Sequence, residues 1–106
     1  MDVVRQFRTS AVRLHVLHHA AEGEIHGAWM SAELAEHGHR ISAGTLYPLL
    51  HRMEEAGLLT SRTDVRDGRR LRLYRATRRG REALRECRAA LAELSDELVQ
   101  PSSERV

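Results

Sequence analysis

Apolar residues in the first part of the chain recur at the spacing of a helix. They predict an amphipathic helix over residues 3–21 that stops at Gly23. Its apolar positions are Phe7, Ala11, Leu14, Leu17 and Ala21. A second, shorter helix is expected from about Gly27 to His37, with Gly38 as its C-terminal cap. Its inward positions are Met30 and Leu34, with Trp29 as a further candidate.

A third helix is predicted within the segment ISAGTLYPLLHRMEEAGLL, residues 41–59. It is expected to run from an N-cap at Ser42 to about Ala56. One face is apolar, at Leu46, Leu49, Leu50 and Met53. The front carries three poor helix formers, Gly44, Thr45 and Pro48. Because proline costs about 3 kcal/mol in a helix interior and less in the first turn, the helix either begins near Gly44 or is kinked.

The period of the pattern then changes from that of a helix to that of a strand. Two segments, residues 58–65 and 69–77, flank Asp67-Gly68, which is a preferred tight-turn pair. In the second segment, one face is expected to carry Leu71, Leu73 and Arg75. The other face is expected to carry Arg70, Arg72 and Tyr74. The pattern predicts a two-stranded ribbon with arginine along one face and at its tip.

A last helix is predicted from an N-cap at Thr77 to Pro101, about 22 residues and so ~33 Å long. Its apolar residues step by three and four, which is the spacing of a coiled-coil seam. This seam consists of Leu84, Cys87, Leu91, Leu94 and Leu98. We expect the seam to form a dimer interface, with Cys87 as a small buried hydrophobic residue or, alternatively, a redox switch.

Three helices followed by a hairpin with a basic tip is the element order of a winged helix-turn-helix. The fold class expected is mainly α with a small β-hairpin (α+β). Residues 1–76 would form the DNA-binding domain, residues 77–100 the C-terminal dimerisation helix, and residues 101–106 a disordered tail. A third helix that reads the major groove explains its front, because small residues and free N–H groups there let bases and phosphates approach. The candidate DNA-reading residues are Ser42, Gly44, Thr45, Tyr47, His51 and Arg52.

The net charge of +2 hides a strong segregation of charge. Residues 62–88 hold eleven arginines against four acids, whereas the segments on either side are acidic. Arginine suits bidentate contacts with phosphate and guanine. The candidate phosphate contacts on the ribbon are Arg66, Arg69, Arg70 and Arg72. The alternatives are a solvated run of charge and a surface that binds an acidic protein.

Several classes of protein are excluded by what the chain lacks. It has no Gly-rich phosphate loop, no nucleophile with a plausible base and no paired carboxylates in an apolar setting, so we do not expect an enzyme or a required cofactor. No run of about 18 apolar residues is present, so no membrane span is expected. With a single cysteine and no secretory signal, we expect a cytoplasmic protein.

Seven histidines in 106 residues suggest a second site. His15 and His19 lie four residues apart on the first helix, a spacing used for divalent metals. His18 and Glu22 complete the candidate ligands, which would suit Zn, Ni, Cd or Cu as an effector. The alternative is that these residues are ordinary surface and boundary side chains. Trp29, the only tryptophan, is either a core residue or a contact for an aromatic effector.

The segments GTLYPLLHRMEEAGLL and LYRATRRGREAL resemble the PadR family of bacterial transcriptional regulators, and the resemblance covers roughly residues 8–98. It implies a homodimeric winged-helix repressor that binds an inverted-repeat operator and is released by an effector. It places Ser42, Thr45, Tyr47 and Arg52 on the DNA-reading helix. The single short C-terminal helix is similar to the smaller branch of the family, in which that helix and the first one form the dimer. Phe7 and Leu14 are therefore further candidate interface residues.

The chain departs from the family pattern at positions near the expected effector site. Ala28, followed by Trp29, stands where the family usually has an aromatic residue after His-Gly. The first helix ends in a histidine-rich run instead of an apolar one. A small aromatic molecule and a metal ion both remain open as effectors.

Overall fold

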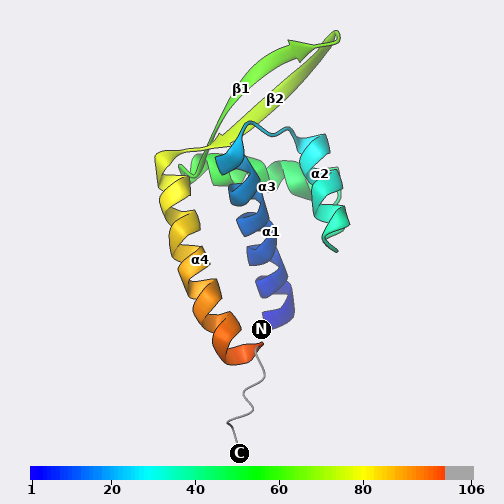
Figure 1. The fold of residues 1–106 in the computed structure, drawn as a ribbon. Coiled ribbons are helices and arrows are strands. Elements are labelled where there is room, and N and C mark those ends of the chain that lie inside the picture. Colours follow the sequence, from blue (N-terminus) through cyan, green and yellow to red (C-terminus); the bar gives the residue numbers. More distant parts are fainter. Residues whose placement is uncertain (100–106) are drawn as a thin grey trace, which may run out of the picture.

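The computed structural model describes residues 1–99 and contains four helices and one two-stranded antiparallel sheet in that range. The elements in chain order are α1 (Val3–Glu22), α2 (Gly27–Glu36), α3 (Ala43–Glu55), β1 (Leu59–Arg66), β2 (Arg69–Ala76) and α4 (Arg78–Leu98). The hairpin projects from one end of the helices, and α4 runs back beside α1 toward the N-terminus (Figure 1). The predicted order of elements is confirmed. The predicted tail, residues 101–106, lies outside the described residues.

The core lies where α1, α2 and α3 meet under the base of the hairpin. Each helix contributes one apolar face, as the periodicity predicts, and these faces bury completely at Val16, Ala20, Met30, Leu34, Leu46 and Leu50. The hairpin closes one end of this core with Leu59 and Ala76. Burial of this apolar surface stabilises the helices far more than their intrinsic propensities do.

The start of α3 decides between the two alternatives that Pro48 raised. The helix begins at Ala43, with Ser42 in the N-cap position and Pro48 inside the helix. The Ser42 hydroxyl caps no backbone N–H and instead lies 3.2 Å from the Thr45 hydroxyl. Because proline has no N–H, the carbonyl of Gly44 loses its usual helical partner. Both residues are exposed, so water can satisfy that carbonyl.

The hairpin has the predicted tight turn. The strands pair from Leu59↔Ala76 to Arg66↔Arg69, and Asp67 and Gly68 both have positive φ, at 53° and 74°. Two successive positive φ angles are those of the turn that matches the twist of paired strands, and Asp-Gly adopts them readily.

The alternation predicted for β2 is wrong at one position. Tyr74 was expected on the exposed arginine face, but only 4% of its surface is exposed. Its backbone pairs with Ile25, through Ile25 N–H to Tyr74 O at 2.9 Å and Tyr74 N–H to Ile25 O at 2.8 Å. The segment between α1 and α2 therefore covers the second face of the hairpin at its base, where a two-faced strand replaces a one-faced one.

Thr77 caps α4 as predicted. Its hydroxyl accepts a hydrogen bond from the Gly80 N–H at 3.0 Å and donates one to the Gly57 carbonyl at 2.6 Å. The predicted end of this helix at Pro101 falls outside the described residues. Within residues 1–99, α4 continues to Leu98.

The seam on α4 divides into two parts. Leu84 is 4% exposed and belongs to the core of its own protomer, which corrects its assignment to a surface seam. Cys87, predicted as buried, is exposed. The reason is that, among the described residues, only Gly80 and Leu84 of α4 are buried against the rest of the chain. The exposed seam therefore consists of Cys87, Leu91, Leu94 and Leu98.

Candidate nucleic-acid interface

The front of α3 is free along its whole length. Leu46, Leu49, Leu50 and Met53 anchor its back in the core. The six candidate DNA-reading residues are all exposed: Ser42, Gly44, Thr45, Tyr47, His51 and Arg52. The structure thus separates the apolar and polar faces of α3 as the sequence predicted.

Tyr47 is held in place by a glycine of the neighbouring helix. A Cβ atom built on Gly27 would lie 2.5 Å from Cε1 and 2.7 Å from the hydroxyl of Tyr47, which is closer than non-bonded atoms approach. Only a residue without a side chain lets the tyrosine ring lie over the start of α2. The ring is still 47% exposed, so its edge remains available for contacts. Sequence reasoning missed this role of Gly27, because no local pattern links it to Tyr47.

The wing, residues 59–76, carries its free arginines at the tip. Arg66, Arg69 and Arg70 are exposed there, and Arg66 lies 3.4 Å from the Asp64 carboxylate. Within the described part of the chain, neither Arg69 nor Arg70 forms an ion pair. These two guanidinium groups are therefore available to bind phosphate.

Arg72, the fourth candidate phosphate contact, has partners within the protein. Its Nε donates a hydrogen bond to the Ser61 hydroxyl at 3.0 Å, and its Nη2 lies 3.8 Å from the Glu54 carboxylate. Glu54 belongs to α3, so Arg72 links the wing to that helix. This contact fixes the direction of the wing relative to the helix front.

A second link to the wing was not visible in the sequence. Arg62 donates two hydrogen bonds to Glu24, at 2.6 and 2.8 Å, across 38 residues of chain. These bonds lower the pKa of the Glu24 carboxyl. Both side chains are partly exposed, so we expect this pair to orient the wing more than to stabilise the fold.

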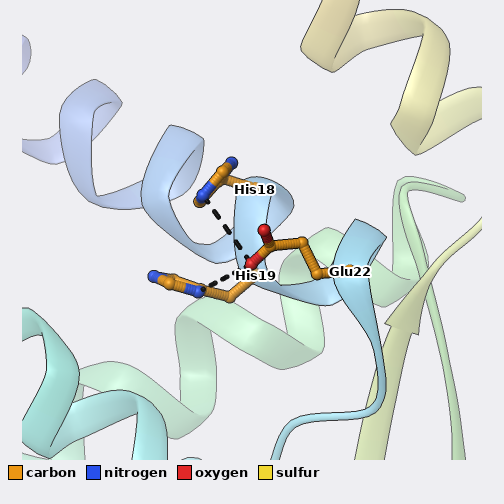
Figure 2. Close-up of side chains that lie close together, drawn as sticks. All are labelled: His18, His19 and Glu22. Carbon is orange, nitrogen blue, oxygen red and sulfur yellow. Dashed lines mark ion pairs between the residues drawn. The ribbon is translucent and has the colours of Figure 1, made fainter.

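The histidines of α1 group differently from the prediction. His18, His19 and Glu22 place their ligand atoms within 4.8 Å of one another (Figure 2). His15, predicted to pair with His19, lies with its ring centroid 5.1 Å from that of His37 and 5.4 Å from that of His39. Partial burial, and then the neighbouring histidines, lower the pKa of His15 and favour its neutral form.

Trp29 is more exposed than a core residue, at 42% of its surface. Its ring meets the His19 ring edge-on, with the centroids 5.1 Å apart. The only tryptophan of the chain thus contacts the histidine group on α1.

Three helices, a two-stranded wing and an exposed third helix define the class as a winged helix-turn-helix protein. The profile of the transcriptional regulator PadR-like family matches residues 16–86. The chain belongs to this family of transcriptional regulators, which are not enzymes.

The relatives agree in both sequence and fold. The transcriptional regulator Rv3488 of Mycobacterium tuberculosis is 58% identical over 96 residues, which cover 91% of this chain and 90% of the relative. A PadR family regulator from Eggerthella lenta is 36% identical, with a TM-score of 0.77 over 90% of this chain and 84% of its own. A PadR-like regulator from Bacillus cereus is 26% identical, with a TM-score of 0.79 over 92% and 99% of the two chains.

The helices of the described residues were also compared with the requirements for crossing a membrane. None of the helices in residues 1–99 is long and apolar enough for this.

Proposed function

We propose that the protein is a homodimeric repressor that binds an inverted-repeat operator in double-stranded DNA and is released by an effector. One observation carries this proposal: the exposed polar front of α3 continues directly into a wing that has free arginines at its tip. A helix of this kind fits the major groove, and cationic groups on a wing bind the adjacent phosphates.

Two exposed apolar strips support the dimer. On α1, Val3, Val4 and Phe7 are each more than 60% exposed. On α4, Leu91, Leu94 and Leu98 are at least 46% exposed. Both strips lie at the end of the molecule away from the wing (Figure 1). Apolar residues at heptad spacing are seldom left in water, so a second copy is their natural cover.

Charge complementarity supports the same arrangement. A cleft beside the first turns of α1 is lined by Arg5, Arg8, Arg40 and Arg52, together with apolar side chains of α1 and α3. The exposed half of α4 carries Glu93, Asp96 and Glu97. An acidic helix from a second copy would therefore meet basic residues at this end of α1.

The wing arginines give the first prediction. Arg69→Ala combined with Arg70→Ala should weaken binding to all DNA, on the order of tenfold, because two phosphate contacts are lost. The dependence of log affinity on log salt should become shallower by about 1.8, which is about 0.9 for each phosphate released. The measurement is fluorescence anisotropy with operator and scrambled duplexes at several salt concentrations.

A matched control removes two arginines from elsewhere. Arg81→Ala combined with Arg85→Ala makes the same change in net charge on the exposed surface of α4. If this control changes the salt dependence as much as the wing pair does, the effect comes from net charge alone and the wing assignment is wrong.

Tyr47 gives a second prediction. Tyr47→Ala should weaken operator binding about tenfold and change binding to scrambled DNA much less, because a groove contact carries sequence preference. Gly27→Ala should reproduce part of this loss without touching α3, since its methyl group would displace the Tyr47 ring. Gly23→Ala is the control, because nothing lies within 4 Å of the added methyl group there. Equal losses on both duplexes would contradict a reading role for Tyr47.

A further inference from the structure

The histidine group on α1 brings two imidazoles and a carboxylate to one point (Figure 2). Glu22 Oε1 lies 3.4 Å from Nδ1 of His19 and 3.8 Å from Nε2 of His18. The helix explains this arrangement, because residues three and four positions before Glu22 lie on the same side of α1. The three side chains are accessible from solvent, with His19 the most enclosed at 15% exposure.

We propose that His18, His19 and Glu22 bind a divalent transition metal ion of the zinc class. Two imidazole nitrogens and one carboxylate oxygen are a zinc ligand set, in which water takes the fourth position. Ligand atoms on a tetrahedral zinc ion are roughly 3.3 Å apart, given zinc–ligand distances of about 2.0–2.1 Å. The two distances to Glu22 Oε1, 3.4 and 3.8 Å, are close to that value. The proposal rests on the proposed function and assigns the chemical class of its effector.

An independent contact of His19 supports the site. Its second ring nitrogen, Nε2, lies 3.5 Å from the carboxylate of Glu33 on α2. When a metal binds Nδ1 of a neutral imidazole, the proton stays on Nε2 and points to a partner, and a carboxylate is the usual one. Glu33 also lies 3.3 Å from Nε2 of His37, and its side chain is only 21% exposed. The metal ligand on α1 is thus oriented by a half-buried carboxylate of α2.

His18 connects the site to α4. Its Nδ1 lies 2.7 Å from Nη2 of Arg88, and a guanidinium only donates hydrogen bonds. Nδ1 therefore accepts, and neutral His18 carries its single proton on Nε2, which is the nitrogen that faces Glu22. A metal ion on Nε2 requires the other tautomer, with the proton on Nδ1. That proton would face Arg88, so metal binding breaks the contact between α1 and α4.

The metal site is thus connected to both functional parts of the molecule. Glu33 links it to α2, whose first residue, Gly27, positions Tyr47 of α3. Arg88 links it to α4, which carries the exposed seam. Metal binding favours the state in which Arg88 has left His18, and so biases the position of α4 relative to α1.

The test measures zinc binding to the full chain without DNA. The chain is first treated with a chelator, and Zn²⁺ is then titrated by calorimetry and by the fluorescence of Trp29, which contacts His19. We expect one ion per chain. His19→Ala and Glu22→Ala should each weaken binding by about 100-fold, since each removes one of three ligands. His51→Ala is the control: it removes an exposed histidine of α3 that lies 3.5 Å from the Glu55 carboxylate, and it should leave zinc affinity unchanged.

Two further variants distinguish a metal site from a simple cluster of ion pairs. Glu33→Gln should weaken zinc binding by about tenfold, as expected for a residue that orients a ligand. Arg88→Ala should tighten zinc binding severalfold, because it removes the competitor for His18. Arg85→Ala, which removes another exposed arginine of α4, should have no effect.

The results that overturn the proposal are equally specific. They are the absence of zinc binding by the unaltered chain, an affinity that survives both His19→Ala and Glu22→Ala, or an equal loss with His51→Ala. Because no DNA is present, such a result rejects the metal site and leaves operator binding to its own test. Conversely, a chain that binds zinc but not DNA would retain the site and reject the repressor.

Discussion

A chain with Leu91→Glu and Leu94→Glu is expected to be a monomer that has lost operator binding. Both leucines lie on the exposed seam of α4, with 46% and 50% of their surfaces accessible in the single protomer. Two carboxylates per subunit would have to be buried at the interface, which is far more costly than leaving them in water. The fold itself should remain intact, because the buried residues of α4 are Gly80 and Leu84.

The loss of binding follows from the symmetry of the operator. A dimer binds two half-sites at once, and the second half-site is contacted at a high effective concentration. A monomer loses this gain, so we expect operator affinity to fall by at least about 100-fold. Sedimentation velocity measures the oligomeric state, and fluorescence anisotropy measures binding to the operator duplex.

The matched control places the same charges on another side of the same helix. Ala89→Glu combined with Ala92→Glu adds two acids at exposed positions of α4 that lie off the seam. This control should remain a dimer and keep its operator affinity within about threefold. A dimer that persists when Leu91→Glu and Leu94→Glu are combined, or a monomer produced equally by the control, would contradict an interface along the seam.

Gly80→Ala is expected to destabilise the fold more than any other single methyl group added to a glycine of the described chain. Gly80 lies in the first turn of α4, directly against the Leu58 carbonyl oxygen. A Cβ atom there would overlap that oxygen and lie 3.4 Å from Cδ2 of Leu17. Backbone cannot move aside as a side chain can, so α4 would have to shift away from the core.

The expected cost of Gly80→Ala is about 3 kcal/mol, at the upper end for adding a methyl group to a packed site. For a domain of this size, this corresponds to a fall in Tm on the order of 15 °C. Thermal unfolding followed by circular dichroism measures it. Gly44→Ala is the control, because its methyl group meets only the Ser42 hydroxyl at 3.9 Å, and alanine is the better helix former. A Tm for Gly80→Ala equal to that of the control would contradict the close contact.

The fold was predictable because its elements are encoded locally. The spacing of Leu46, Leu49, Leu50 and Met53 identifies the buried face of α3 without knowledge of its neighbours. Asp67-Gly68 adopts the hairpin turn through its own backbone preferences, and Thr77 caps α4 through its own hydroxyl. Each of these features depends on residues within a few positions of one another, so a pattern in the sequence is enough to find it.

Features that depend on distant segments were not predictable in this way. Tyr74 is buried because Ile25, far away in the sequence, pairs with it. Leu84 has the heptad spacing of a surface seam, yet it faces the protomer's own core. Periodicity determines which residues share a face of a helix, but tertiary packing determines what that face contacts.

The candidate sites illustrate the same limit. The exposed front of α3 follows directly from the position of its apolar face, so all six DNA-reading candidates were found in the sequence. On α1, the spacing of four residues selected His15 and His19, whereas the structure places His15 beside His37 and His39 from another segment. His18 instead joins His19 and Glu22, and the contacts with Glu33 and Arg88 connect elements that no local pattern relates.

The most direct test of the central claim is binding of the purified protein to the DNA just upstream of its own coding sequence. A scrambled duplex of equal length and composition serves as the reference, and both are measured at two salt concentrations. The account predicts that the upstream duplex binds at least about 1,000-fold more tightly than the scrambled one, with two chains per site and affinity that falls steeply with salt. Equal and weak binding to both duplexes would contradict it and would identify the arginine-rich wing as a surface for an acidic protein.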